Sequence, residues 1–406
     1  MAAEARRFRL GVNYWPARTA MDWWPRFDPA EVVADFARIA TAGMDSVRCF
    51  LRWEDFQPEP DRIDRAMLGH LVTVADAAAG AGLQLMPTLF TGHMSGVNWI
   101  PGWALGGAER DPRFRVVSGG RVWDGGLRNW FTDDGLMRAQ ALLAAEAAAA
   151  LAGHDALWAW DLGNENSNCS VPPDRELGRR WLGEMTAAIR GADPDAPITI
   201  GLHMEDLEED RHLGPREAAE ACDFLTMHGY PIYARWSEGP LDHELVPFLT
   251  RITRWLGEGK DVLFSEFGLP TIARRGAEPD DAAWPEGPPE SLVGEEAAAS
   301  YTGLVLDGLR EAGSSGAMLW CYADYAPEMW TEPPLDEARH ERSFGLWRAD
   351  GSAKPAVVAV TAAAGRSRLA PPDDGWIDID RTAFWARPGV ELPRLYGRYR
   401  GATPAG

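Results

Sequence analysis

Long apolar runs, cysteine pairs and an excess of positive charge are all missing from this chain of 406 residues. No apolar run approaches the roughly 20 residues that a membrane-spanning helix needs, and we expect no membrane contact. The four cysteines are scattered without a C-x-x-C pair, which favours reduced thiols over a disulfide framework or a zinc site. The start, MAAEARRFRLGVNYW, has no apolar core of a secretion signal. Together these absences predict a cytoplasmic protein.

The charge of the chain is strongly negative. Asp and Glu number 61 against 40 Lys and Arg, which gives a formal net charge of −21. Nucleic acids and anionic membrane surfaces are bound by clustered cations, so we expect neither as a partner. The charge favours solubility and a neutral or cationic ligand.

Short apolar strands alternate with helical segments along most of the chain. We expect strands at residues 8–14, 45–51, 83–90, 156–163, 197–202, 223–229, 261–268 and 315–322. Helical stretches between them include 29–42, 135–153 and 295–313. Near-continuous apolar strands separated by helices are typical of a parallel sheet covered on both faces. Eight such units without a repeated glycine-rich phosphate turn predict an α/β fold, a (β/α)₈ TIM barrel rather than an open doubly wound sheet.

The connections that follow strands are longer than those that lead back to them. The long ones are residues 91–133, 203–215, 269–294 and 323–347. Loops after strands build the active face of such barrels. We assign residues 1–365 to a catalytic barrel and 366–406 to a short C-terminal extension. Trp376, Trp385 and Tyr396 predict that this extension packs on the barrel or on a second subunit, which leaves a homo-oligomer open.

The chain has 19 tryptophans, more than core packing usually needs. Flat aromatic faces are common in sugar-binding clefts, although many of these rings will fill the core. Four of them share the loop at 91–133: Trp99, Trp103, Trp123 and Trp130. We expect one or two of these, Trp123 in particular, to contact a ligand.

Polar and aromatic residues end several of the expected strands. Asn164 and Glu165 end the fourth strand in LWAWDLGNENSN, and Glu266 ends the seventh in LFSEFG. The other strand ends of this kind carry Arg48, His228, Tyr230 and Trp320. A closed barrel brings the C-terminal ends of its strands around one mouth, so we expect the two glutamates to face each other there.

Two opposed carboxyl groups suit retaining glycoside hydrolysis. One attacks the anomeric carbon as nucleophile, and the other protonates the leaving oxygen and then activates water. The two pKa values must be pushed apart. Arg48 would keep one carboxylate ionised, while the neighbouring negative charge and partial burial would keep a proton on the other.

The ordered set of strand-end residues resembles the clan A glycoside hydrolases, and most closely family 5, over residues 8–364. The resemblance implies that Glu165 is the acid/base and that Glu266, in its E-F-G context, is the nucleophile. It also implies that Asn164 holds the 2-hydroxyl of the sugar and that Tyr230 hydrogen-bonds Glu266.

Four further residues match the family's sugar-binding positions. Arg48 matches the arginine of the second strand, His228 the histidine after the sixth, and Trp320 the platform tryptophan of the eighth. His93, in TGHMSG, corresponds less closely to the histidine after the third strand, because its loop context differs. The resemblance implies no metal and no other cofactor.

The resemblance implies a small β-linked oligosaccharide as the substrate. Family 5 includes endoglucanases, endomannanases, exo-acting β-mannosidases and β-glucosidases. Since the sequence shows no secretion signal and no carbohydrate-binding module, we favour an exo-acting β-mannosidase, on general likeness to the mannan-active branch. An endo-β-1,4-mannanase, an endoglucanase or a β-glucosidase stays open.

Two other classes of barrel fit less well. A metal-dependent amidohydrolase would need His-x-His at the end of the first strand, where this chain has Asn13-Tyr14-Trp15-Pro16. A catalytically inactive carbohydrate-binding barrel would usually lack a catalytic carboxylate, and both are present here. The acidic run EDLEED at 205–210 is interpreted as a solvated surface.

Overall fold

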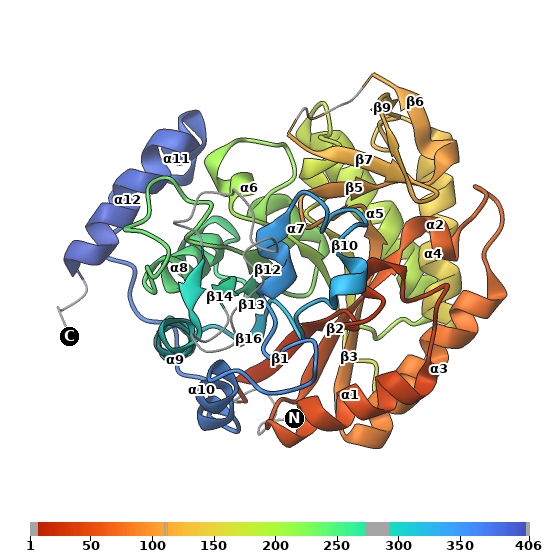
Figure 1. Ribbon diagram of the computed structural model, residues 1–406. Helices are drawn as coiled ribbons and strands as arrows, with labels where there is room; N and C mark the ends of the chain where they lie inside the picture. The colour runs from red at the N-terminus through yellow and green to blue at the C-terminus, as the bar shows by residue number, and fades with distance from the viewer. Residues whose placement is uncertain (1–6, 109–110, 112, 273–291, 403–406) are drawn as a thin grey trace.

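Eight parallel strands form the centre of the molecule, and helices surround them (Figure 1). The computed structural model describes residues 7–108, 111, 113–272 and 292–402. The strands are β1 (Arg9–Tyr14), β2 (Ser46–Arg52), β3 (Gln84–Thr91), β10 (Trp160–Asn164), β11 (Ile198–Gly201), β12 (Leu225–His228), β13 (Val262–Phe267) and β16 (Gly316–Leu319). All eight predicted strands are present, and the predicted TIM barrel is confirmed.

The order of the strands closes the sheet on itself. Neighbouring strands run β11-β10-β3-β2-β1-β16-β13-β12, and every pair is parallel. The two end strands meet where His203 bridges His228, whose backbone N–H donates to the carbonyl of Leu202 at 2.8 Å. Since all the strands point the same way, their C-terminal ends gather at one mouth.

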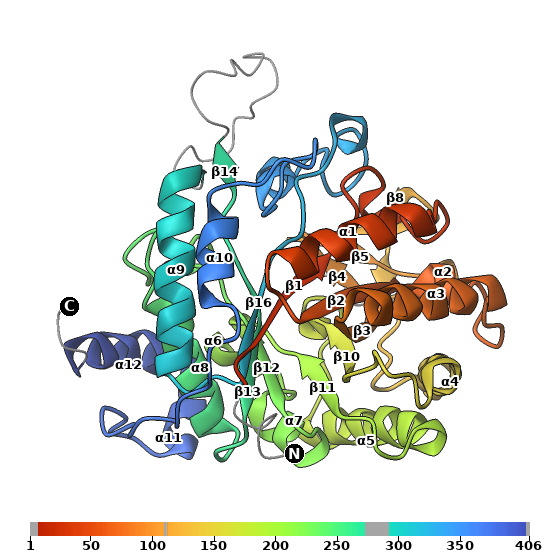
Figure 2. The ribbon, with the colours of Figure 1, turned by 90° about the horizontal axis from the view of Figure 1, so that it is seen from below.

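The helices alternate with the strands and cover the outside of the barrel (Figure 2). They are α1 (Pro29–Thr41), α3 (Arg65–Ala81), α4 (Asp134–Leu151), α5 (Arg175–Ala192), α7 (Pro215–Ala221), α8 (Leu245–Leu256), α9 (Glu295–Glu311) and α10 (Ala356–Ala363). Several begin at an aspartate whose carboxylate accepts a backbone N–H of the first turn, as Asp28 does in α1 and Asp64 in α3. The helices predicted at 29–42, 135–153 and 295–313 are confirmed. Within the described residues, none of the helices combines the length and apolar character that crossing a membrane requires.

The long segment after β3 folds into two small sheets at the mouth of the barrel. One contains β4 (His93–Met94), β5 (Val97–Trp99), β7 (Arg115–Ser118) and β8 (Arg121–Trp123), and the other pairs β6 (Leu105–Gly107) with β9 (Gly126–Leu127). Shorter elements at the mouth are α2 (Trp53–Phe56), α6 (Glu205–Glu208), β14 (Thr271–Ile272) and β15 (Val293–Gly294). The sequence predicted the length of these segments but not the small sheets.

The barrel interior changes from apolar to polar along its axis. Met86, Ala159, Leu263 and Met318 form an apolar cluster separate from the core between strands and helices. Fully buried Arg48, in register with Met86, bonds to side chains of four other strands, and its partners Thr88 and Asp161 follow Met86 and Ala159 toward the C-terminal ends of their strands. The apolar cluster fills the interior of the barrel. The polar side chains around Arg48 lie under the mouth and support the residues that line it.

The C-terminal extension lies on the flank of the barrel (Figure 1). It contains α11 (Arg381–Ala386) and α12 (Pro388–Ala402). The hydroxyl of Tyr396 donates to the carboxylate of Asp242 at 2.7 Å, and Phe248 of α8 packs against the rings of Trp376 and Tyr396. The described part of the extension therefore packs on the barrel of its own chain.

Candidate active site

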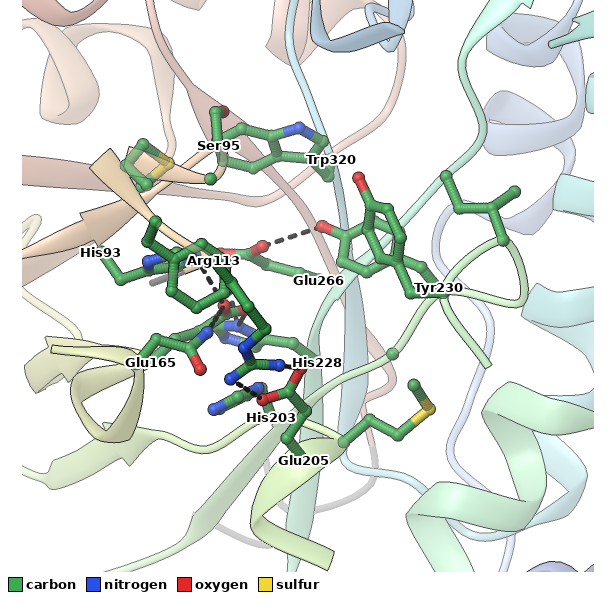
Figure 3. Close-up of a pocket in the computed structure, with 18 of the residues that line it drawn as sticks. His93, Ser95, Arg113, Glu165, His203, Glu205, His228, Tyr230, Glu266 and Trp320 are labelled. Carbon is green, nitrogen blue, oxygen red and sulfur yellow. Dashed lines mark hydrogen bonds and ion pairs between the residues drawn. The ribbon is translucent and has the colours of Figure 1, made fainter. Parts of the chain in front are cut away.

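A cavity of about 890 Å³ opens at the C-terminal ends of the strands. Its lining includes seven of the residues singled out from the sequence: His93, Asn164, Glu165, His228, Tyr230, Glu266 and Trp320. Figure 3 shows the side chains of Glu165, His228 and Glu266 converging at its centre. Arg48 lies directly beneath, where it contacts Glu266 and Asn164.

Arg48 anchors the floor of the cavity. Its guanidinium donates to Asp161 Oδ2 at 2.6 Å and to Glu266 Oε1 at 2.5 Å, and all three side chains are buried. The same guanidinium also donates to Asn13, Thr88 and Asn164. A buried cation is tolerated only when opposite charges and hydrogen-bond acceptors surround it, as they do here.

Glu266 is held by two donors. Oε1 accepts from Arg48, and Oε2 accepts from the hydroxyl of Tyr230 at 2.8 Å, the contact that the sequence resemblance implied. Tyr230 follows β12, so donors from two other strands fix the orientation of a carboxylate on β13. Both oxygens keep lone pairs for a further contact from the cavity side.

Glu165 reaches the cavity because the chain turns sharply as β10 ends. Its backbone has φ 48°, in the left-handed region that a residue with a side chain seldom adopts, and the 3-10 helix η4 (Asn166–Asn168) follows. A Cβ on Gly163 would lie 2.4 Å from the side-chain amide of Asn166, so a larger residue here would have to displace that side chain. The sequence LGNEN thus forces a carboxylate into the mouth from the end of a buried strand.

Asn164 connects the buried Arg48 to the loop that carries His93. Its Oδ1 accepts from Arg48 at 2.8 Å, and its Nδ2 donates to the backbone carbonyl of His93 at 2.8 Å. These bonds fix the orientation of the side-chain amide, with Oδ1 toward Arg48 and Nδ2 toward His93. One hydrogen of Nδ2 is left for a ligand. An N–H in this place can bind a sugar hydroxyl oxygen.

His228 connects the two glutamates. Its Nδ1 lies 2.9 Å from Oε1 of Glu165 and 3.6 Å from Oε1 of Glu266. The buried Nε2 has no hydrogen-bond partner among the described residues. A neutral ring with its proton on Nδ1 therefore buries no unpaired N–H, whereas an imidazolium would.

The environment shifts the pKa values of the two glutamates in opposite directions. Burial raises the pKa of Glu266 above its usual value, and the charges of His228 and Arg48 offset this only in part. Burial also acts to raise the pKa of Glu165, but positive charge on His203 and His228 outweighs it and places that pKa below its usual range. This order is the reverse of the one that an acid at Glu165 and an ionised nucleophile at Glu266 require.

An acid role for Glu165 would require neutral imidazoles around it. Burial lowers the pKa of His93, which favours a neutral ring at that position. Without positive charge on the surrounding rings, burial and the negative charge of Glu266 would both act to keep a proton on Glu165.

Glu165, His228 and Glu266 also lie close enough together to ligate a metal ion, since one ligand atom from each falls within 4.8 Å of the others. The Arg48 guanidinium already occupies Oε1 of Glu266. Its positive charge opposes a divalent cation at the same oxygen. The donor set therefore fits a carboxylate pair held by an arginine better than a metal centre.

Trp320 lines the cavity, but the loop tryptophans do not. The indole Nε1 of Trp320 donates to Glu341, which fixes the ring beside the cavity. Trp123 lies on β8, is 44% exposed and is absent from the cavity lining, so the structure does not bring it to the site. The reason is that its loop folds into a sheet in which Trp99 is buried and Trp123 is exposed.

Several lining residues were missed by the sequence analysis. They include Phe114, Arg113, His203, Tyr233, Trp236 and Glu341. His203 follows β11 in PITIGLH, so the strand-end rule could have found it. The interpretation of 205–210 as a solvated surface holds for Glu209 and Asp210, which are exposed. It is wrong for the first part of the run: Asp206 is buried, and Glu205 and Glu208 line the cavity, because α6 begins soon after a barrel strand.

The fold and the opposed glutamates define the class of the molecule, a TIM barrel with a pair of carboxylates at its mouth. Comparison with known proteins is more specific. No family model matches the chain. An exo-β-1,4-mannosidase from Opitutaceae bacterium strain TAV5 is 29% identical with a TM-score of 0.71, over 89% of this chain and 60% of that one. A mannan endo-1,4-β-mannosidase 2 from Oryza sativa subsp. japonica is 28% identical over 135 residues, 27% of this chain and 30% of the relative.

A third relative covers nearly the whole chain. A family 5, subfamily 18 glycoside hydrolase variant from Streptomyces cattleya, solved with Manβ1-4GlcNAc, has a TM-score of 0.77 and 23% identity over 96% of this chain and 90% of that one. At this identity the likeness shows the fold. The chain therefore resembles a family 5 glycoside hydrolase in fold, and the two mannosidases add a likeness in sequence. The chain spans less than two thirds of the length of either mannosidase.

Replacing Arg48 with methionine should destabilise the protein strongly. The substitution leaves Asp161 and Glu266 buried without their cation, which costs about 3–5 kcal/mol for a broken buried pair. Urea unfolding followed by circular dichroism measures the loss. The control is Arg65→Met, which removes an ion pair to Glu146 with a 70% exposed arginine and should change stability by less than about 1 kcal/mol. Equal losses in the two variants would contradict the role of Arg48.

Removing the hydroxyl of Tyr230 should raise the pKa of Glu266 further. The hydroxyl donates to the ionised carboxylate and so lowers this pKa, and Tyr230→Phe should therefore raise it. Carbon-13 NMR of glutamate-labelled protein measures the titration, with the resonance assigned from Glu266→Gln. Tyr233→Phe is the matched control, because that hydroxyl bonds Glu341 and not Glu266. An unchanged titration in Tyr230→Phe would refute this account.

Proposed function

We propose that this protein is a retaining glycoside hydrolase, an exo-acting β-mannosidase that removes terminal β-mannosyl units from small oligosaccharides. The observation that carries the proposal is the pair of glutamates, with one oxygen of Glu165 within 4.8 Å of one oxygen of Glu266. Retaining enzymes place their carboxyl groups about 5–5.5 Å apart, and inverting enzymes about 6.5–9.5 Å apart. The short separation supports a covalent double displacement.

In the first step, Glu266 attacks the anomeric carbon. Its C–O bond to the sugar forms as the glycosidic C–O bond breaks, and Glu165 gives its proton to the departing oxygen. Arg48 and Tyr230 hold the attacking carboxylate in a fixed orientation. The products are a glycosyl-enzyme, a free alcohol and an ionised Glu165.

In the second step, water replaces the enzyme on the sugar. Ionised Glu165 takes a proton from the water as its oxygen attacks the anomeric carbon, and the bond to Glu266 breaks. Glu165 is protonated again and Glu266 is ionised again, so the site returns to its starting state. Two inversions at one carbon leave the β configuration unchanged.

The choice of mannose rests on the relatives. One solved homologue is named as an exo-β-1,4-mannosidase, and another was solved with Manβ1-4GlcNAc. We propose that a terminal mannosyl unit lies between the two glutamates and beside Trp320, whose indole offers an apolar face to the ring. The rice mannanase favours an endo-β-1,4-mannanase as the second candidate.

Comparison of three aryl glycosides tests the proposal. We expect kcat/KM for the aryl β-mannoside to exceed the values for the β-glucoside and the β-galactoside by about tenfold or more, since each well-placed polar contact to a sugar hydroxyl can be worth that much. Proton NMR should show the β anomer of mannose as the first product. No turnover of any of the three would refute glycosidase activity, and equal rates would refute the choice of mannose.

Removal of each glutamate should have a different effect. Glu266→Ala should abolish turnover of every substrate, because no glycosyl-enzyme can form. Glu165→Ala should lose about 10²–10⁴-fold on sugar leaving groups but keep the first step on an activated aryl leaving group, which departs without a proton. Steady-state rates measure the loss of turnover in each variant, and mass spectrometry detects the trapped glycosyl-enzyme.

Azide distinguishes the two roles independently. It should raise the rate of Glu165→Ala and give a β-glycosyl azide, because a small anion can enter where the base was lost. The control is Glu184→Ala, which changes an exposed glutamate of α5 and should behave as the unmodified protein. A β-glycosyl azide from Glu266→Ala, together with an α-glycosyl azide from Glu165→Ala, would mean that the roles are exchanged.

A further inference from the structure

Glu341 is a further carboxylate in the cavity lining that the reaction does not use. It lies in the 3-10 helix η7 (Arg339–Ser343), in the long segment after β16, and is 6% exposed. Nothing in the sequence pattern singled it out. Its position in the wall of a cavity, far in sequence from both catalytic glutamates, raises the question of what it binds.

The partners of Glu341 are neutral donors from three different loops. Oε1 accepts from the hydroxyl of Tyr233 at 3.1 Å, and Oε2 accepts from Ser95 Oγ at 2.9 Å. Oε2 also accepts from the indole N–H of Trp320 at 3.2 Å. Among the described residues, neither lysine nor arginine forms an ion pair with this carboxylate; the only basic ring beside it is His340, 3.6 Å from Oε1.

This arrangement leaves acceptor capacity for a ligand. An ionised carboxylate offers about four lone-pair positions, and three are used here. Burying a charge among neutral groups costs stability, and a glutamine could tie the same three loops together without that cost. A carboxylate in this place is therefore better explained by a ligand that donates hydrogen bonds to it.

The position of Glu341 relative to Glu165 and Glu266 determines which part of a bound sugar it can contact. Figure 3 shows Trp320 and Ser95 on one side of Glu266, with Glu165 and His203 on the other. Glu341 bonds both Trp320 and Ser95, so it lies on that first side. A sugar whose anomeric carbon sits between Glu165 and Glu266 and whose ring extends toward Trp320 would present to Glu341 the hydroxyls remote from the anomeric carbon.

We propose that Glu341 accepts hydrogen bonds from the remote hydroxyls of the sugar in the cavity, chiefly the 4-hydroxyl, and so selects terminal units for hydrolysis. This inference rests on the proposed function. A carboxylate only accepts, so it needs a ligand O–H. A terminal unit has a free 4-hydroxyl. An internal β-1,4-linked unit has a glycosidic oxygen there, which carries no proton and would leave the charge buried without its partner, at a cost to binding.

Substrate analogues test the proposal in the full-length protein. The substrates are an aryl β-mannoside, its 4-deoxy analogue and its 4-O-methyl analogue, the last of which imitates an internal unit. The unmodified protein should lose about 10–100-fold in kcat/KM on either analogue, as expected for a hydrogen bond to a charged group. Glu341→Gln should be slower on the parent substrate but lose less than about threefold on the 4-deoxy analogue relative to its own parent rate.

The 4-O-methyl analogue gives a second readout that a purely structural role would not move. The amide of Glu341→Gln can donate a hydrogen bond to the ether oxygen, so this variant should accept the analogue better, relative to its parent substrate, than the unmodified protein does. Ser95→Ala is the matched control. It removes a different partner of the same group, keeps the carboxylate, and should keep the full penalty on both analogues.

The outcomes separate the inference from the function on which it rests. Equal penalties in the unmodified protein and Glu341→Gln, or no penalty in the unmodified protein, would overturn the role of Glu341 while the hydrolase activity stands. If Glu341→Gln does not fold, the unmodified protein and Ser95→Ala still test the proposal. Equal kcat/KM values for the parent substrate and its two analogues in these proteins would overturn it. No turnover of the parent aryl β-mannoside by the unmodified protein would overturn the proposed function itself, and this inference with it.

Discussion

The burial of one arginine organises the polar half of this barrel. Arg48 has no exposed surface, and its charge is balanced by Asp161 from β10 and Glu266 from β13. Because a buried guanidinium must satisfy its donors, it fixes the side chains of several strands at once. The arrangement of side chains in the cavity floor thus follows from the need to neutralise and hydrogen-bond the guanidinium. The orientation of Glu266, the proposed nucleophile, follows from the same need.

The two glutamates differ in how the fold constrains them. Glu266 sits within a regular strand and accepts from Arg48 and Tyr230. Glu165 projects from a turn with positive φ, accepts from His228 and Asn168, and is 14% exposed at its side chain. Under the proposed function, the more buried carboxylate suits attack on one carbon, and the more exposed one suits exchange of a proton with a leaving group and then with water.

Much of the fold and the centre of the site could be predicted from the sequence, because both follow from local rules. Apolar strands of similar length alternate with helices, and a polar residue at the end of such a strand in a closed barrel must face the mouth. Arg48, Asn164 and Glu165 follow this rule. Trp123 and Glu341 belong to long segments after strands, whose folding depends on contacts between segments distant in sequence. From composition we expected a tryptophan of the loop after β3 to contact the ligand. In the structure, the small sheet holds Trp123 away from the cavity, and Phe114 of the same loop lines it.

One wall of the cavity comes from outside the barrel repeat. Gly389 of α12 belongs to the lining, and Trp236, also in the lining, packs with its ring 5.2 Å from that of Tyr396 on the same helix. The reacting centre and this outer wall are therefore built by separate parts of the chain. A change in the appended helices would therefore reshape this outer wall with no change to the strands that carry the two glutamates. In this architecture, the outer wall of the cavity and the arrangement of its centre can vary independently.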